Sequence, residues 1–152
     1  MRQAAILRAR IGIARGVSAS TISGLQKHFD RLDPRQIQLA AKAGLWAGAN
    51  EIKVEAQLSI TRGSVSGKNH VASKPGEPPN NDTGVLKNNI ETISTGPLTA
   101  EVQSKAPYAV ALEYGTSKMG ERPYMRPAAK KMKPVVAEHV RVILDTVLKR
   151  KG

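Results

Sequence analysis

The chain has 152 residues, of which 40% are hydrophobic and only 3% aromatic, so it can form one domain with a core of mostly small aliphatic side chains. The absence of cysteine excludes disulfides, thiolate metal sites and thiol nucleophiles. A net charge of +12 favours contact with nucleic acid or with an acidic protein surface, simple solubility being the alternative. Because a core of small side chains is thin, we expect part of the apolar surface to be buried against partner subunits.

Residues 1–21 predict a basic arm or an edge strand, because they contain arginines, no acid and no clean periodicity. The arginines interrupt the apolar residues, so we expect no signal peptide. No run approaches the roughly 20 apolar residues of a membrane span. Residues 22–152 then predict a single domain, which starts with a short amphipathic helix at 22–32.

Asp33 and Pro34 predict a helix start, with Asp33 as the cap, and the apolar spacing continues the helix to about Gln57. Gly44 and Gly48 lie inside this helix, where each costs about 1 kcal/mol relative to Ala. We interpret them as positions where another backbone packs closely. The only tryptophan, Trp46, is interpreted as a packing or interface residue.

Residues 61–82 are rich in Gly, Ser, Pro and Asn and predict a long loop. A helical turn near residue 85 is expected to follow. Alternating apolar residues then predict strands at 89–94 and 98–104, joined by a turn at 95–97 into a hairpin.

Pro107 predicts the start of a short helix at 108–114, and Gly115 is placed to end it in a left-handed conformation. A basic loop at 116–126 follows, and Pro127 predicts the start of the last helix. The buried stripe expected on that helix comprises Met132, Val135, Val136, His139, Val140, Ile143 and Val147. The predicted fold is α+β, with a long N-terminal and a C-terminal helix packed on a small antiparallel sheet.

Catalytic signals are weak. The histidines are isolated and no HExxH or Cys/His cluster occurs, so no metal, cofactor or catalytic residue is expected. The segment 63–69 looks like a phosphate-binding loop, but its glycines are one residue too close and Asn69 replaces the hydroxyl residue. The remaining enzyme alternative is a site that gathers His28 or His139 with Glu113.

Three phrases stand in a fixed order: SKPGEPPNNDTGVLKNNI at 73–90, APYAVALEYGTSKMGERPYMRPA at 106–128, and the helix after them. Together they resemble the neck, or tail-completion, proteins of long-tailed bacteriophages. The resemblance covers about 56 residues directly and 24–57 more loosely, while the basic arm and the long loop depart from it. The predicted contacts between subunits all match the family's motifs except Arg126, and they are Pro75, Gly76, Pro78, Pro79, Thr83, Gly84, Leu86, Tyr108, Glu113, Tyr114, Gly115, Thr116, Arg122, Pro123, Tyr124, Arg126 and Pro127.

The resemblance implies a structural virion protein and not an enzyme. Such a protein would be assembled in the host cytoplasm into a homo-oligomeric ring at the head–tail junction, sixfold as first choice and twelvefold as second. Its partners would be other neck proteins, the tail terminator or tail tube, head-closure proteins and, non-specifically, packaged DNA. The loops 73–84 and 115–127, which flank the predicted hairpin, are the expected ring contacts.

Two points stay open in the sequence. Glu113 could accept backbone hydrogen bonds or pair with Arg122 or Arg126, within one subunit or between two. The alternative function is a free basic protein that binds nucleic acid without sequence specificity, although no known recognition motif is present. Residues expected to face DNA or an acidic partner are Arg8, Arg10, Arg15, Arg62, Lys68 and Lys74.

Overall fold

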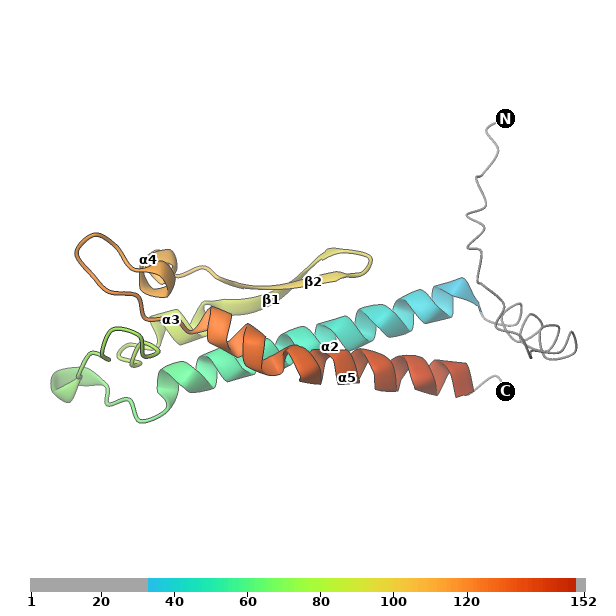
Figure 1. Ribbon diagram of the computed structural model, residues 1–152, viewed down its shortest axis with the longest axis horizontal. Coiled ribbons are helices and arrows are strands. Elements are labelled where there is room, and N and C mark those ends of the chain that lie inside the picture. The colour runs from blue at the N-terminus through green and yellow to red at the C-terminus, as the bar shows by residue number, and fades with distance from the viewer. Residues whose placement is uncertain (1–32, 150–152) are drawn as a thin grey trace, which may run out of the picture.

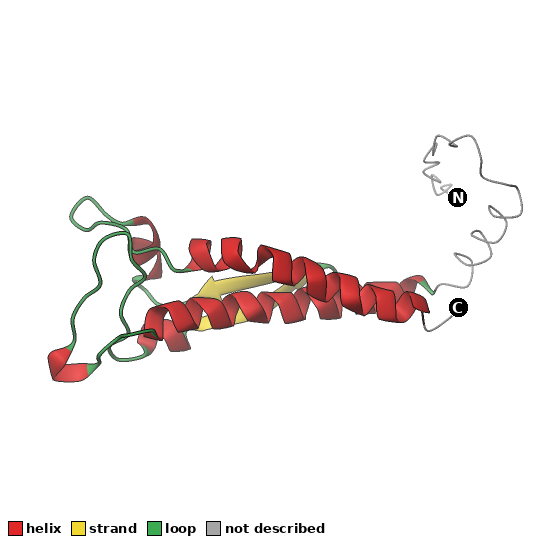
Figure 2. Ribbon diagram, turned by 60° about the horizontal axis from the view of Figure 1, so that its bottom comes forward, coloured by secondary structure: helices red, strands yellow, loops and turns green. Residues whose placement is uncertain are grey.

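The computed structural model describes residues 33–149. Two long antiparallel helices, α2 and α5, lie side by side in one layer, and a β-hairpin covers one face of that layer (Figures 1 and 2). The remaining loops and two short helices gather where α2 ends and α5 begins, and we call this region the loop end (Figure 1). The predicted α+β fold is thus confirmed. The predicted arm at 1–21 and helix at 22–32 lie outside the described residues.

Helix α2 spans Pro34–Thr61, and its start is the predicted one. The Asp33 carboxylate accepts a hydrogen bond of 2.9 Å from the backbone N–H of Arg35, and proline occupies the first turn, where no intrahelical N–H donor is needed. The helix ends one turn later than predicted. The extra turn brings Ile60 into the core, where its side chain is fully buried.

Helix α5 spans Met125–Lys149 and crosses α2 at two glycines. A Cβ atom added to Gly44 would lie 2.8 Å from the Cα of Val140, and one added to Gly48 would lie 2.8 Å from the Cγ1 of Val136. Because real Cβ atoms do not approach other atoms so closely, only glycine permits this crossing. The prediction that another backbone packs on this side of α2 is confirmed.

The hairpin consists of β1, Ile90–Gly96, and β2, Thr99–Ser104, and the one-turn helix α3, Val85–Asn88, precedes it. The strands pair antiparallel from Ile90 opposite Ser104 to Gly96 opposite Thr99, with an irregularity after Ser94. The predicted hairpin and helical turn are confirmed. Leu98, predicted to start the second strand, instead lies exposed in the turn.

The core is small. Only three large side chains, those of Tyr124, Ile60 and Ile90, are fully buried among the described residues. The buried stripe predicted on α5 is wrong in part: Ala128 is the one buried residue of this helix, the predicted members are mostly half-buried, and Val135 is exposed. The reason is that α5 packs mainly on α2, along one of its sides.

The long loop between α2 and α3 holds itself in place. It contains one short 3-10 turn, η1, Gly67–Asn69, and the backbone N–H of Gly67 donates to the Asp82 carboxylate at 2.9 Å. The side-chain amide of Asn80 donates to the carbonyl of Val71 at 2.8 Å. None of the helices within residues 33–149 is both long and apolar enough to cross a membrane.

Candidate functional site at the loop end

The carboxylate of Glu113 caps the start of α5. Glu113 lies near the end of the short helix α4, Ala109–Tyr114, and is almost completely buried. Its Oε2 accepts hydrogen bonds from the backbone N–H groups of Tyr124 at 2.8 Å and Met125 at 3.0 Å, and its Oε1 accepts one from the N–H of Arg126 at 2.8 Å. The next residue, Pro127, has no N–H group. The helix start therefore leaves none of these backbone donors unpaired.

Burial by itself would raise the pKa of Glu113, but the three backbone donors and the side chain of Arg126 outweigh it and lower this pKa below its ordinary value. The carboxylate is therefore charged where it meets the positive end of the α5 dipole. The question that the sequence left open is answered for this residue, because Glu113 finds these partners within one chain.

The side chain of Arg126 joins three parts of the loop end. Its Nε lies 3.1 Å from the Glu113 carboxylate, and its Nη2 donates to the Glu113 carbonyl at 2.8 Å and to the Glu121 carboxylate at 2.7 Å. The guanidinium also lies over the ring of Tyr114, 4.8 Å from its centroid. One arginine thus links α4, the loop after it and the first turn of α5.

Gly115 permits the sharp turn that brings Glu113 to this helix. Its φ of 73° is positive as predicted, but its ψ of −178° places it outside the left-handed helical region, in a conformation open essentially to glycine alone. A Cβ atom here would lie 2.8 Å from the carbonyl oxygen of Met119 and 2.9 Å from the nitrogen of Glu121. Both the backbone angles and the close contacts therefore require glycine.

The loops 73–84 and 115–127, which are separate in sequence, lie against each other. The guanidinium of Arg122 donates from Nε to the carbonyl of Ser73 at 3.0 Å, and the N–H of Gly76 donates to the carbonyl of Glu121 at 2.7 Å. Gly120 packs so closely on Pro75 that a Cβ atom on it would lie 2.8 Å from the proline Cβ. These contacts hold the two motif-bearing loops as one unit.

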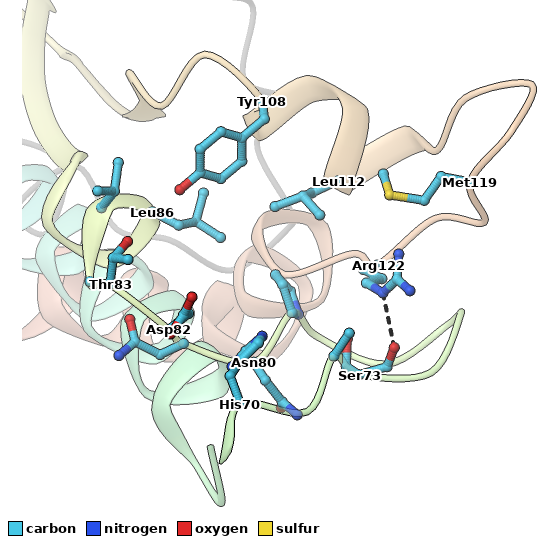
Figure 3. Close-up of a pocket in the computed structure, with 15 residues that line it drawn as sticks. His70, Ser73, Asn80, Asp82, Thr83, Leu86, Tyr108, Leu112, Met119 and Arg122 are labelled. Carbon is cyan, nitrogen blue, oxygen red and sulfur yellow. Dashed lines mark hydrogen bonds between the residues drawn. The ribbon is translucent and has the colours of Figure 1, made fainter. Parts of the chain in front are cut away.

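A groove of about 450 Å³ lies beside this junction (Figure 3). Leu86, Tyr108, Leu112 and Met119 line it with apolar and aromatic surface, and the Arg122 side chain reaches from the groove to Ser73. Its other residues are mainly short and polar, namely His70, Ala72, Ser73, Pro79, Asn80, Asn81, Asp82, Thr83, Gly84 and Val85. Within residues 33–149, no group of three His, Cys, Asp or Glu side chains is placed to hold a metal ion.

The model of one protein family, described as "Bacteriophage HK97-gp10, putative tail-component", matches residues 23–115. The chain belongs to this family of phage tail components. The match includes α2, the hairpin and α4, and it ends at Gly115. The predicted relationship to structural proteins of phage tails is thereby confirmed. No curated protein and no solved structure matches the chain.

The predicted contact residues of this tail component fall into groups of different exposure. Those buried inside the subunit are Pro79, Leu86, Glu113 and Tyr124. Those of intermediate exposure are Pro78, Gly84, Gly115, Arg122 and Pro123. Those exposed are Pro75, Gly76, Thr83, Tyr108, Tyr114, Thr116, Arg126 and Pro127. The buried group builds the fold, so only the remaining residues have surface to offer a partner.

The predicted electrostatic residues divide by position. Arg62, Lys68 and Lys74 are exposed on the long loop, whereas the arginines of the arm, Arg8, Arg10 and Arg15, lie outside the described residues. The sequence interpretation missed groove residues such as Leu112 and Met119. Their only signal was their place inside the motif-bearing phrase, because tertiary contacts create the groove.

The enzyme alternative that joined His139 to Glu113 is wrong. His139 lies beside Glu51 of α2, with 3.8 Å between the imidazole Nε2 and the carboxylate. Glu113 caps the start of α5, and the 14 residues of helix between Met125 and His139 correspond to about 21 Å.

Proposed function

We propose that this phage tail component is a structural protein of the head–tail junction. In this proposal its copies form a ring around the DNA channel, complete the tail and join it to the head. The observation that carries the proposal is that the residues through which the chain resembles neck proteins form one internally braced end of the molecule. Its site is a contact surface and performs no catalysis.

The bracing suits a contact surface because association is costly when loops must first be ordered. Glu113 and Arg126 fix the loop that follows α4, and Arg122 fixes the loop that contains Ser73. A partner would therefore meet surfaces that already have their bound shape. The groove adds a concave feature, and the buried Ser73 hydroxyl on its wall has no hydrogen-bond partner among the described residues.

The exposed side chains of the loop end have the chemistry of contact residues. Tyr114 is 63% exposed and Tyr108 is 43% exposed, and tyrosine is among the residues that contribute most to protein interfaces. Val110 of α4 is also exposed. We propose that these side chains contact neighbouring copies or the adjoining neck, tail-terminator, tail-tube or head-closure proteins.

The ring is proposed to be sixfold, to match a tail tube, with twelvefold symmetry as the second choice. A closed ring joins two different faces of each copy, so the loop end would meet another face on its neighbour. The exposed cations Arg62, Lys68 and Lys74 could then lie along the channel, where contacts to phosphates let DNA slide because they carry no sequence information.

Phage particles test the proposal. A phage lacking this chain is expected to produce unjoined heads and tails in electron micrographs, and the wild-type chain supplied in trans should restore joined virions. Tyr114→Ala should restore fewer, whereas Leu98→Ala, which changes a 52% exposed residue in the hairpin turn, should restore them fully. Normal virions without the chain, or its absence from purified virions, would overturn the proposal.

The alternative, a free nucleic-acid-binding protein, predicts a different result. The isolated monomer would then bind DNA near physiological salt, with affinity falling steeply as salt is raised. Such binding without any incorporation into particles would favour the alternative.

A further inference from the structure

Helix α2 carries a second apolar surface, none of whose side chains lines the groove. Leu39 is 60% exposed, Trp46 42%, Val54 45% and Leu58 48%. At 3.6 residues per turn, these four side chains fall on one face of the helix, together with the small residues Ala43 and Ala47. We call these six residues the α2 stripe. It extends over about 29 Å of helix.

The stripe contains no charged residue. The carboxylates of α2 turn instead toward α5, where Glu55 pairs with Lys131 at 2.7 Å and Glu51 lies near His139. Two hydrogen-bonding side chains on the same face already have partners. The Asn50 carbonyl oxygen accepts from the Thr92 hydroxyl of β1, and the Gln57 amide donates to the Lys87 carbonyl of α3. A charge-free face offers nothing to a phosphate backbone, so it does not fit nucleic acid.

Other elements cover the remaining sides of α2, and the hairpin turn borders the stripe only at Leu39. The glycine side at Gly44 and Gly48 packs on α5, and the side with Ala56 and Ile60 forms the core under the hairpin. Figure 2 shows the two helices in front with the hairpin behind them, so no described element covers the front of the helical layer.

We propose that the α2 stripe packs against a second copy of this chain, as one of the two faces that the ring requires. This inference rests on the proposed function. An apolar stripe that includes tryptophan and small alanines permits close helix packing and is typical of the centre of an interface. Because the core of one subunit fully buries only three large side chains, burial between copies would also supply stability that the subunit lacks.

Trp46, the only tryptophan of the chain, reports directly on the stripe. The full chain is studied over a concentration series by sedimentation and by tryptophan fluorescence. We expect wild type to associate as concentration rises. The Trp46 emission should then shift to shorter wavelength, because its indole side chain becomes shielded from water. Leu58→Lys should raise the dissociation constant at least about tenfold, since burying a lysine in an apolar contact loses more than 1.4 kcal/mol.

Two further variants separate a loss of the stripe contact from a general effect of added charge. Val71→Lys places the same charge on a 69% exposed valine of the long loop and should associate as wild type does. Val54→Ser tests the stripe without adding charge and should weaken association in the same direction. Circular dichroism checks that each variant is folded, and Val54→Ser replaces Leu58→Lys if the latter is not.

Three results would overturn the inference: a wild-type chain that stays monomeric at its highest soluble concentration, folded stripe variants that associate normally, or association without a change in Trp46 emission. A concentration-independent blue emission in a monomer would mean that Trp46 is already shielded within one chain, and it would overturn the inference in the same way. The particle experiment is separate. Association unaffected by stripe variants would refute the stripe contact alone, whereas absence from virions would refute the proposed function.

Discussion

Gly44→Ala tests whether the α2–α5 crossing is as close as the structure shows. The added Cβ would lie 2.8 Å from the Cα and 3.2 Å from the backbone N of Val140. Both are backbone atoms, so no side-chain rotation can relieve the contact. Since carbon atoms pack best at about 3.5–4.0 Å, the helices must separate by roughly 0.7 Å or more.

Two effects of opposite sign decide the result. Alanine by itself stabilises a helix interior by about 1 kcal/mol relative to glycine. Overpacking a well-packed contact costs about 1–3 kcal/mol, and loosening the crossing also weakens the packing along both helices. We therefore expect a net loss of about 1–2 kcal/mol in the free energy of unfolding, and a melting temperature lower by about 3–8 °C.

Thermal and urea unfolding followed by circular dichroism measure this loss, at one protein concentration so that association does not change the comparison. The matched control is Ala137→Gly, an exposed position within α5 and outside the α2 stripe, which should lose about 1 kcal/mol from helix propensity alone. If Gly44→Ala instead stabilises the protein by about 1 kcal/mol, the two helices do not approach as closely as described and the reasoning fails.

Three further predictions concern the loop end. Glu113→Gln should lower the free energy of unfolding by about 1–3 kcal/mol, because the buried helix cap loses its charge. The folded-state pKa of Glu113 is lowered, so its contribution to the free energy of unfolding is present above the unfolded pKa of about 4.3 and is lost as the pH falls through the folded pKa. Lowering the pH should therefore destabilise the Gln variant less than wild type. Equal losses of stability in acid would contradict this. Gly115→Val should impair assembly and folding of the loop after α4, and normal particle yield would refute the conformational argument. Arg122→Met should make the loop at Ser73 more sensitive to proteolysis than Lys118→Met does, because only Arg122 donates to the Ser73 carbonyl; identical cleavage rates would count against it.

Local patterns in the sequence were enough for most of the fold. Asp33 and Pro34 marked the start of α2 because capping and proline geometry depend on adjacent residues. Alternating side chains marked the hairpin, because strand periodicity is equally local. Gly44 and Gly48 indicated that another backbone packs closely on α2, although the sequence could not say which element would supply it.

Tertiary structure decided what the motif residues do. Glu113 and the N–H groups that it caps are 11 to 13 residues apart, and Arg122 and Ser73 are 49 apart, so no local rule could pair them. The buried stripe predicted on α5 was wrong in part for a related reason. Periodicity identifies an apolar face, but only the packed chain shows whether the subunit itself or a partner covers that face.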